Sequence, residues 1–553
     1  MHDGRPVPAI RRSSETTELR RWQVRALSAL AVWEQDPRRP FLISAAPGAG
    51  KTRPALEFAR SQLAAGRAAT IVVACPTAPL TRQWARAADR LGLDLVPDHD
   101  SPRPPAGFHG VAVTYARIAR APKRWAAALA RTTVVITDEA HHLGQDLTWG
   151  DAFATAFCAS DRRLLLSGTP FRSDATPIPG VSYDADGVAV PDIAFTYAEA
   201  VHDGVCRPVR FVAYDGTLSW RSGDDVIEAG FDTVLSTREA SRRYRTAIST
   251  ELPEGLARIL READARLRTI RQDGHRDAGG LVIAADSEHA RQIAKLLHEA
   301  TGKHPVVVLH DEQRSATRLA AFTSSTEPWI VAVNMVSEGV DIPRLRVGVY
   351  ATAAKTAMTF RQIVGRFVRV IPQRPVQASW LYVPADPILR NHAATIEREL
   401  SAPLRRPGET DLAELDDERA ERLQGERGPT PDFVPLSAEV VSQLTLFGGA
   451  QPLPAPAHVP TRWQTVTAQA GREVEARPAG EPAAATPAFE RRARLREERH
   501  RLVSEVRRRD GASHREINQW LNQKVGIASV EQATIPELER SVDLLMKRLT
   551  ARR

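Results

Sequence analysis

Residues 45–52 read Ala-Ala-Pro-Gly-Ala-Gly-Lys-Thr and match the phosphate-binding pattern G-x-x-x-x-G-K-[ST], except that Ala45 replaces the first glycine. The segment follows a short apolar run and precedes a helical pattern, so its backbone N–H groups should surround phosphates at the positive end of a helix. The residues that would supply these groups are Gly48, Ala49 and Gly50. Lys51 would reach the β- and γ-phosphates, and the hydroxyl of Thr52 would ligate Mg²⁺.

An acidic pair, Asp138 and Glu139, directly follows an apolar run at residues 134–137. A carboxylate at a strand end can hold Mg²⁺ through water, which is the role expected for Asp138. Glu139 can polarise the water that attacks the γ-phosphate. Alone, such a pair is usually a solvated turn; downstream of a phosphate-binding loop, it predicts a hydrolysis site.

A third element, residues 362–369, reads Gln-Ile-Val-Gly-Arg-Phe-Val-Arg. Gly365 permits close approach of another chain segment, and Arg366 and Arg369 share one helix face. Guanidinium groups delivered across a domain cleft stabilise the charge that develops on a γ-phosphate. We therefore expect Gln362, Arg366 and Arg369 to belong to the catalytic site, although taken alone the arginines would more often be surface or salt-bridge residues.

These three elements sit among short, continuous apolar runs that alternate with helical patterns. Runs at residues 70–74 and 133–137 belong to the first half of the chain, and runs at 280–284 and 329–333 to the second. Continuous rather than alternating apolar runs indicate strands buried on both faces, as in a parallel sheet. The sequence therefore predicts two tandem α/β domains.

The composition changes outside these two regions. Residues 237–250 and 253–271 read as helices, either a solvated joining face or an arm that faces nucleic acid. Residues 448–487 are rich in Pro, Ala and Gly and favour a linker. The expected organisation is an N-terminal tail at 1–16, a first domain at 17–208, a connecting helical segment at 209–277, a second domain at 278–395, a charged and Pro/Ala-rich linker at 396–489, and a helical module at 490–553.

The chain has 553 residues, enough for roughly three to four domains. Its formal net charge of +8 favours a polyanionic partner. No apolar run approaches the roughly 20 residues of a membrane span, and the N-terminus lacks the apolar core of a signal peptide. We therefore expect a cytoplasmic protein without a membrane partner. The cysteines, at positions 75, 158 and 206, fit no zinc-binding spacing.

Together the motifs resemble those of a superfamily 2 helicase or translocase of the DEAH-box type, with two RecA-like domains, over residues 19–387. Residues 19–23, Leu-Arg-Arg-Trp-Gln, are similar to the adenine-binding element of the branch that holds excision-repair and phage branch-migration helicases. The resemblance implies that Gln23 contacts adenine. The chain departs from the family pattern at Ala45, and at Ile363, where arginine is frequent.

The resemblance also implies residues for nucleic-acid contact and for coupling. Cys75-Pro76-Thr77 with Gln83-Trp84, and Thr114-Tyr115, are similar to the motifs that contact the nucleic-acid backbone. Residues 167–170, Ser-Gly-Thr-Pro, are similar to the motif that links hydrolysis to domain movement, and residues 337–343 to one near nucleotide and strand. The residues implied are Thr77, Thr114, Ser167, Thr169, Ser337, Gly339 and Asp341. Hydroxyls such as these suit phosphate contacts with little sequence specificity.

The expected function is an ATP-dependent DNA helicase or translocase that uses ATP and Mg²⁺. An RNA helicase or remodeller with the same core is the first alternative. A non-processive ATP-dependent switch tethered to the replication sliding clamp is the second. The intact residues of the hydrolysis site argue against a non-enzymatic scaffold.

The pentapeptide Gln443-Leu444-Thr445-Leu446-Phe447 resembles the segment by which bacterial proteins dock on the sliding clamp. In that pattern Leu446 and Phe447 enter an apolar pocket while Gln443 forms hydrogen bonds. The alternative is a C-terminal extension that packs Leu444 and Phe447 onto the second domain.

The C-terminal module begins with an arginine-rich helix at residues 490–509, which suits either non-specific DNA binding or a solvated helix with internal ion pairs. Ser513 with Glu516, and Thr534 with Glu537, form capping boxes that open two further helices. Helical spacing predicts that Trp520 belongs to the core of this module.

Overall fold

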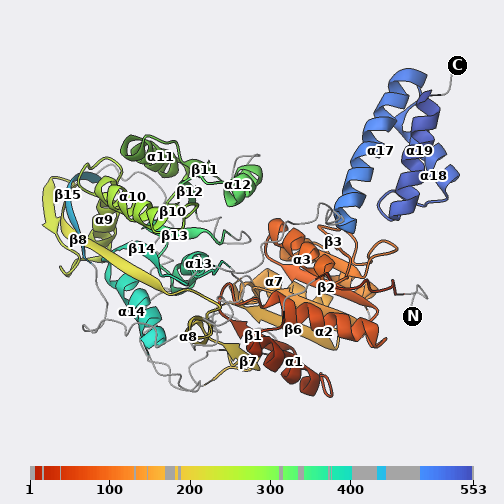
Figure 1. The fold of residues 1–553 in the computed structure, drawn as a ribbon, viewed down its shortest axis with the longest axis horizontal. Coiled ribbons are helices and arrows are strands. Elements are labelled where there is room, and N and C mark those ends of the chain that lie inside the picture. The colour runs from red at the N-terminus through yellow and green to blue at the C-terminus, as the bar shows by residue number, and fades with distance from the viewer. Residues whose placement is uncertain are drawn as a thin grey trace, which may run out of the picture.

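The structure of the protein is a computed structural model. It describes residues 7–14, 18–37, 39–129, 132–145, 147–168, 181–184, 189–309, 315–333, 342–371, 374, 376–401, 433–443 and 486–550. Two sheet domains lie side by side, and a three-helix bundle extends from the first of them (Figure 1). The predicted fold class, two tandem α/β domains with a C-terminal helical module, is confirmed.

The first domain is built on a seven-stranded parallel sheet with the order β3-β4-β2-β5-β6-β1-β7. The strands are β1 (Phe41–Ala45), β2 (Thr70–Cys75), β3 (Leu95–Pro97), β4 (Gly110–Thr114), β5 (Thr133–Asp138), β6 (Arg162–Ser167) and β7 (Ile193–Phe195). Every residue of β5 is buried, which explains its continuous apolar run. Since the strands are parallel, the segments after β1, β2, β5 and β6 meet at one edge of the sheet.

Helices cover both faces of this sheet. They are α1 (Arg21–Trp33), α2 (Thr52–Ala64), α3 (Ala78–Arg90), α4 (Tyr115–Ala119), α5 (Pro122–Ala128), α6 (His142–Gln145), α7 (Leu147–Ala156) and α8 (Tyr197–His202). One buried cluster holds Trp22, Phe58 and Trp84, and a second holds Tyr115, Trp125 and Phe157. The residues at the carboxyl edge of the sheet are therefore attached to a well-packed domain core.

The second domain has the strand order β11-β12-β10-β13-β14-β8-β15, and β9 pairs with β8. The strands are β8 (Val209–Ser222), β9 (Asp225–Ala229), β10 (Gly279–Ala284), β11 (Val306–Val308), β12 (Trp329–Val333), β13 (Leu345–Ala351), β14 (Ser379–Pro384) and β15 (Phe433–Gln443). The helices are α9 (Thr237–Ala247), α10 (Leu256–Gln272), α11 (Ser287–Thr301), α12 (Ser315–Ser324), α13 (Ala357–Phe367) and α14 (Pro387–Ser401).

The segment 209–277, expected to connect the two domains, is instead part of the second one. β8 pairs in parallel with β14 and antiparallel with β9 and β15. The expected helices correspond to α9 and α10. The strands escape a search for continuous apolar runs because β9 is largely exposed and β8 mixes buried with exposed positions.

The segment 396–489, expected as a linker, also contributes to the second sheet. Its residues Phe433–Gln443 form β15, which pairs antiparallel with residues 213–222 of β8. β15 is an edge strand, with Ala438 and Val440 buried and Val434 and Leu436 exposed. Alternation of buried and exposed residues in a short segment is a weak sequence signal for a strand. The Pro- and Ala-rich residues that follow favoured a linker instead.

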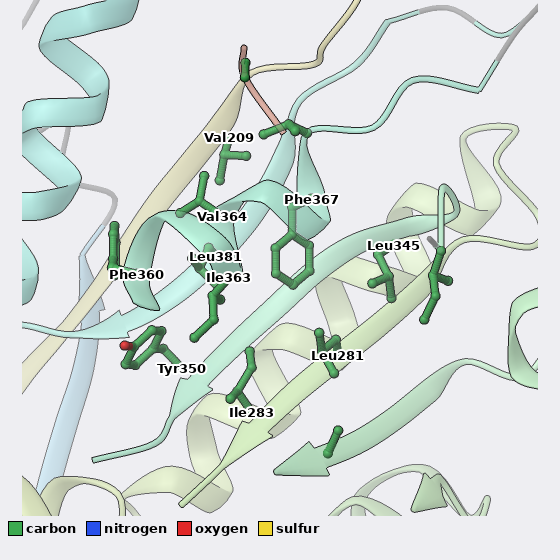
Figure 2. Close-up of a cluster of buried hydrophobic side chains, with 14 of the residues drawn as sticks. Val209, Leu281, Ile283, Leu345, Tyr350, Phe360, Ile363, Val364, Phe367 and Leu381 are labelled. Atoms are coloured by element: carbon green, nitrogen blue, oxygen red, sulfur yellow. The ribbon is translucent and has the colours of Figure 1, made fainter. Parts of the chain in front are cut away.

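Helix α13 buries one apolar face against the second sheet. Phe360, Ile363, Val364 and Phe367 recur at helical spacing and point toward the strands in Figure 2. Gly348 on β13 allows this packing, since a Cβ there would lie 2.4 Å from the ring of Phe367. The residues of α13 between these apolar positions therefore face away from the sheet.

The C-terminal module packs α17 (Ala488–Asp510), α18 (His514–Val525) and α19 (Ile535–Thr550) around a small apolar core. Both predicted capping boxes are confirmed: Ser513 and Glu516, and Thr534 and Glu537, exchange side chain–backbone hydrogen bonds. Trp520 is half-buried beside this core, and the guanidinium of Arg548 lies 4.6 Å from its ring centroid.

Two arginines of α17 have a structural role that neither interpretation of this helix included. Arg492 is buried and donates to the carbonyl of Glu531 at 2.6 Å. Arg499 is buried and donates to the side chain of Asn518 at 2.8 Å. These two guanidinium groups hold the module together rather than facing solvent.

In the described part of the chain, no helix combines the length and apolarity that crossing a membrane requires.

Candidate active site

The phosphate-binding pattern forms a loop between β1 and α2. Gly48 and Gly50 have φ angles of +80° and +87°, which side-chain-bearing residues rarely adopt. Ala45 is the last residue of β1, is buried, and pairs in register with Phe195. The departure at Ala45 is therefore compatible with the loop, because this position has extended strand geometry and needs no glycine.

Lys51, at the end of this loop, contacts both carboxylates that follow β5. Its Nζ lies 3.4 Å from Asp138 Oδ1 and donates a hydrogen bond to Glu139. Burial alone would lower the pKa of Lys51, but the charges of Glu139 and Asp138 outweigh it and raise the pKa above its usual value. The ammonium and the two carboxylates form one charged cluster.

Glu139 turns sharply out of the end of β5. Its φ angle of 53° lies in the left-handed region, which is uncommon for a residue with a side chain. Burial would raise the pKa of Glu139, but the charges of Lys51 and His141 outweigh burial and hold the pKa below its usual range. Glu139 is therefore a carboxylate at neutral pH, the form that a water-polarising base requires.

His141 links Glu139 to Ser167 at the end of β6. His141 Nδ1 lies 3.2 Å from Ser167 Oγ and 3.6 Å from Glu139 Oε2. Ser167 is 1% exposed, so it contacts the hydrolysis site rather than an external ligand. The position of His141, two residues after Glu139, could have drawn attention to it in the sequence. Its contacts with Glu139 and Ser167 are visible only in the structure.

Gln23 lies against the phosphate-binding loop. Its Nε2 donates to the carbonyl of Gly50 at 3.0 Å, and its Oε1 accepts from the backbone N–H of Arg20 at 2.9 Å. Arg20 also donates to the carbonyl of Ala49 at 2.7 Å. Sequence reasoning missed Arg20, although it lies within the element at residues 19–23. Contact between Gln23 and adenine stays a prediction.

A cavity of about 570 Å³ opens beside this element, between α1 and α2. Its lining includes Leu19, Leu27, Arg53 and Phe58. The lining runs along α2 from Arg53, in its first turn, to Gln62 and includes no residue of the phosphate-binding loop. Its volume lies within the range of small-molecule sites.

The end of α13 brings the second domain against the loop. A Cβ on Gly365 would lie 2.7 Å from Pro47, and a Cβ on Gly48 would lie 3.4 Å from Arg369 Cγ. The backbones of Arg369 and Cys206 form an isolated antiparallel bridge. Gln362 and Arg366 are half-buried on α13. The helix ends at Phe367, so Arg369 lies beyond it, at the loop, and does not share a helix face with Arg366 as the sequence predicted.

The structure places two of the expected nucleic-acid contacts at helix N-termini. Thr77 is the N-cap of α3, and its buried hydroxyl has no hydrogen-bond partner among the described residues. Thr114 is the N-cap of α4 and accepts a hydrogen bond from the N–H of Arg117. Both lie at the carboxyl edge of the sheet.

Several expected residues lie outside the described residues. These are Thr169, Ser337, Gly339, Asp341, Leu444, Leu446 and Phe447. Gln443 is the last residue of β15, so the described segment 433–443 includes only the first residue of the pentapeptide.

A phosphate-binding loop, an acidic pair beside its lysine and an arginine from a second α/β domain are the features of an ATP-hydrolysing enzyme. Two family models extend this to a superfamily 2 enzyme of the helicase type with two RecA-like domains. Residues 16–172 match the family model "Type III restriction enzyme, res subunit", and residues 264–371 match "Helicase conserved C-terminal domain".

Two relatives come from Mycobacterium tuberculosis. "Uncharacterized protein MT2985" of strain CDC 1551 / Oshkosh is 39% identical over 95% of this chain and 92% of its own length. "Uncharacterized protein Rv2917" of strain ATCC 25618 / H37Rv is 43% identical over 78% of this chain and 72% of its own length. The chain belongs to the same family as these mycobacterial proteins, within the superfamily 2 helicases.

Among solved structures, a fragment assigned to the HsdR subunit of a type I restriction enzyme from Vibrio vulnificus YJ016 is similar to this chain. The TM-score is 0.48 at 18% identity, and the match covers 69% of this chain and 67% of the fragment.

Proposed function

We propose that the protein is an ATP-dependent DNA helicase or translocase that couples ATP hydrolysis between its two RecA-like domains to movement on or unwinding of DNA. One observation carries this proposal: Lys51, Asp138 and Glu139 form a single cluster beside a loop that Arg369 of the second domain covers. A cleft built from two domains can close on a nucleotide and open after hydrolysis, which is the two-state element that a motor needs.

The residues of the cluster fit ATP and Mg²⁺. The loop needs glycine at position 50, because φ there is +87° and a Cβ would lie 3.1 Å from Gln23 Nε2. Thr52 and Asp138 would hold Mg²⁺, which neutralises charge on the phosphates when it is bound. Lys51 would bind the β- and γ-phosphates, and Glu139 would orient the attacking water.

DNA is favoured over RNA by three features. The first is the resemblance of residues 19–23 to excision-repair and branch-migration helicases. The second is the match of residues 16–172 to a family model named for a restriction enzyme subunit. The third is the clamp-like pentapeptide that begins at Gln443.

The unpartnered hydroxyl of Thr77 supports a backbone phosphate as the ligand. A cytoplasmic location stays a prediction.

The preferred nucleic acid is tested by ATPase activation. We expect single-stranded, duplex or forked DNA to raise ATP turnover at least tenfold more than an RNA of the same sequence. Activation by RNA alone would favour the RNA remodeller. DNA activation without strand displacement or translocation would favour a clamp-tethered switch. Equal turnover with and without every nucleic acid would contradict the proposal.

We further propose that residues 443–447 dock on the bacterial sliding clamp. The full chain should bind the clamp with a Kd near 10 μM, equivalent to about −7 kcal/mol, as two apolar anchors and backbone hydrogen bonds would supply after ordering. Leu446→Ala combined with Phe447→Ala should abolish that binding, since each anchor contributes ~1.5–3 kcal/mol on burial.

The same double variant separates docking from packing. Docking predicts that DNA-stimulated ATPase and the melting temperature stay close to those of the wild type. Packing of Leu444 and Phe447 onto the second domain predicts a melting temperature lower by several degrees and a wild-type chain that does not bind the clamp. Clamp binding by surface plasmon resonance and thermal unfolding on the same samples decide between them.

A further inference from the structure

Two helices of the first domain each donate one hydrogen bond to Asp138. Trp84 Nε1, on α3, donates to Asp138 Oδ2 at 2.8 Å. The hydroxyl of Tyr115, the first residue of α4, donates to the backbone carbonyl of Asp138 at 2.5 Å. Trp84, Tyr115 and Asp138 are 1%, 2% and 4% exposed, so water cannot replace either donor.

The two donors reach Asp138 from opposite faces of the sheet. Trp84 belongs to the buried cluster that includes α1 and α2, and Tyr115 to the cluster that includes α5 and α7. Trp84 holds Oδ2, so Oδ1 is the oxygen that accepts the N–H of Glu139 at 3.1 Å and lies near Lys51. Trp84 thus fixes which carboxylate oxygen of Asp138 faces the phosphate-binding loop, and Tyr115 holds the backbone from which that carboxylate projects.

The same two helices begin at residues expected to contact nucleic acid. Thr77 caps α3, and Trp84 follows it by seven residues, about two helical turns. Thr114 caps α4, and Tyr115 is its next neighbour. A helix transmits a shift of its first turn along its length, so a contact at either cap can reach Asp138 through packed side chains.

We propose that Trp84 and Tyr115 are positioning residues that couple nucleic-acid contact at Thr77 and Thr114 to the orientation of Asp138. The inference rests on the proposed function and adds the route by which nucleic acid stimulates hydrolysis. Partners that orient a metal ligand commonly change metal affinity 10- to 100-fold when removed. Residues 83–84 resemble a motif that contacts the nucleic-acid backbone. We assign a different role to Trp84, because its indole is buried and faces the hydrolysis site.

The positioning role is tested without nucleic acid and without turnover. Trp84→Phe and Tyr115→Phe each keep an aromatic ring and remove the donor. Binding of a fluorescent ADP analogue is followed as Mg²⁺ is titrated. We expect the Mg²⁺ concentration for half-maximal binding to rise about tenfold in Trp84→Phe and severalfold in Tyr115→Phe.

Trp125→Phe is the matched control. Trp125 is 1% exposed in the same domain and packs on Phe157, away from Asp138. This variant should lose core packing comparable to that lost in Trp84→Phe while its Mg²⁺ dependence stays that of the wild type. An unchanged Mg²⁺ dependence in Trp84→Phe and Tyr115→Phe, or an equal shift in Trp125→Phe, would overturn the positioning role.

The coupling is tested by adding single-stranded DNA to the same titration. Linkage requires that DNA raise the affinity for the Mg²⁺–nucleotide by the factor by which the nucleotide raises the affinity for DNA. We expect this factor to fall toward one in the double variant Trp84→Phe/Tyr115→Phe. A factor above one that the double variant retains would overturn the coupling alone. A wild-type factor of one with every DNA and RNA tested would also overturn the coupling, whereas the proposed function is overturned only if no nucleic acid changes ATP turnover.

Discussion

Glu139→Gln is expected to bind ATP with near-normal affinity and to lose roughly 10²- to 10⁴-fold in turnover, the usual contribution of a positioned base. Glutamine has nearly the same shape but cannot take up a proton, so the attacking water would no longer be polarised. Lys51 keeps Asp138 as a partner in the variant, and the phosphate-binding loop is untouched. Single-turnover hydrolysis and nucleotide binding on the same samples separate the two steps.

Glu228→Gln is the control for this substitution, since Glu228 is exposed on β9 and lies far along the chain from the cluster. It should hydrolyse ATP like the wild type. Near-normal turnover in Glu139→Gln would remove Glu139 from its assigned role. A loss of nucleotide binding equal to the loss of turnover would instead assign Glu139 to the binding of Lys51 or Mg²⁺.

Contiguous motifs made much of this site predictable from the sequence. The turn at residues 45–52 and the acidic pair after β5 depend on local backbone geometry, which neighbouring residues determine. Parallel strands then bring their carboxyl ends to one edge, which is why Lys51 and Glu139 meet although 88 residues separate them. The sheet topology supplies a contact that no local pattern contains.

Contacts that depend on how helices pack were not predictable in the same way. Trp84 has the spacing of a core residue on α3, and nothing in its surroundings in the sequence indicates that its N–H reaches Asp138, 54 residues later. Ser167 resembles a coupling residue, but its contact with His141 follows from the register of β5 and β6. Such details require the three-dimensional arrangement.

The second domain was harder to delimit because its last strands come from segments with weak patterns. β8 precedes the apolar runs of the second domain by many residues, and β15 follows them, beyond α14. β15 is an antiparallel edge strand that exposes alternate residues to solvent, and β8, although it lies inside the sheet, also has exposed positions. A search for continuous apolar runs finds the central strands and leaves the edge unassigned.

Arg369→Ala is expected to lower nucleic-acid-stimulated ATP turnover by about 10³-fold or more, the effect of losing an arginine that stabilises charge on the transferred phosphoryl group. The substitution removes the side chain that lies near Gly48 and leaves the backbone bridge with Cys206 intact. The domains should therefore keep their packing. Turnover at saturating ATP and nucleic acid, together with the melting temperature, measures both consequences.

Arg361→Ala is the matched control, because Arg361 lies on α13, just before Arg369 in the chain, and pairs with Glu399. Partly exposed ion pairs contribute about 0–1 kcal/mol, so this variant should keep most of its activity and nearly all of its stability.

Arg369→Lys refines the test, since lysine restores the charge without the planar, forked donors of arginine. If the charge alone stabilises the phosphoryl group, lysine should recover much of the turnover; if forked geometry is required, the lysine variant should stay near the alanine variant. Normal hydrolysis by Arg369→Ala, or unfolding of the variant at the assay temperature, would give Arg369 a structural role at the domain interface in place of a catalytic one.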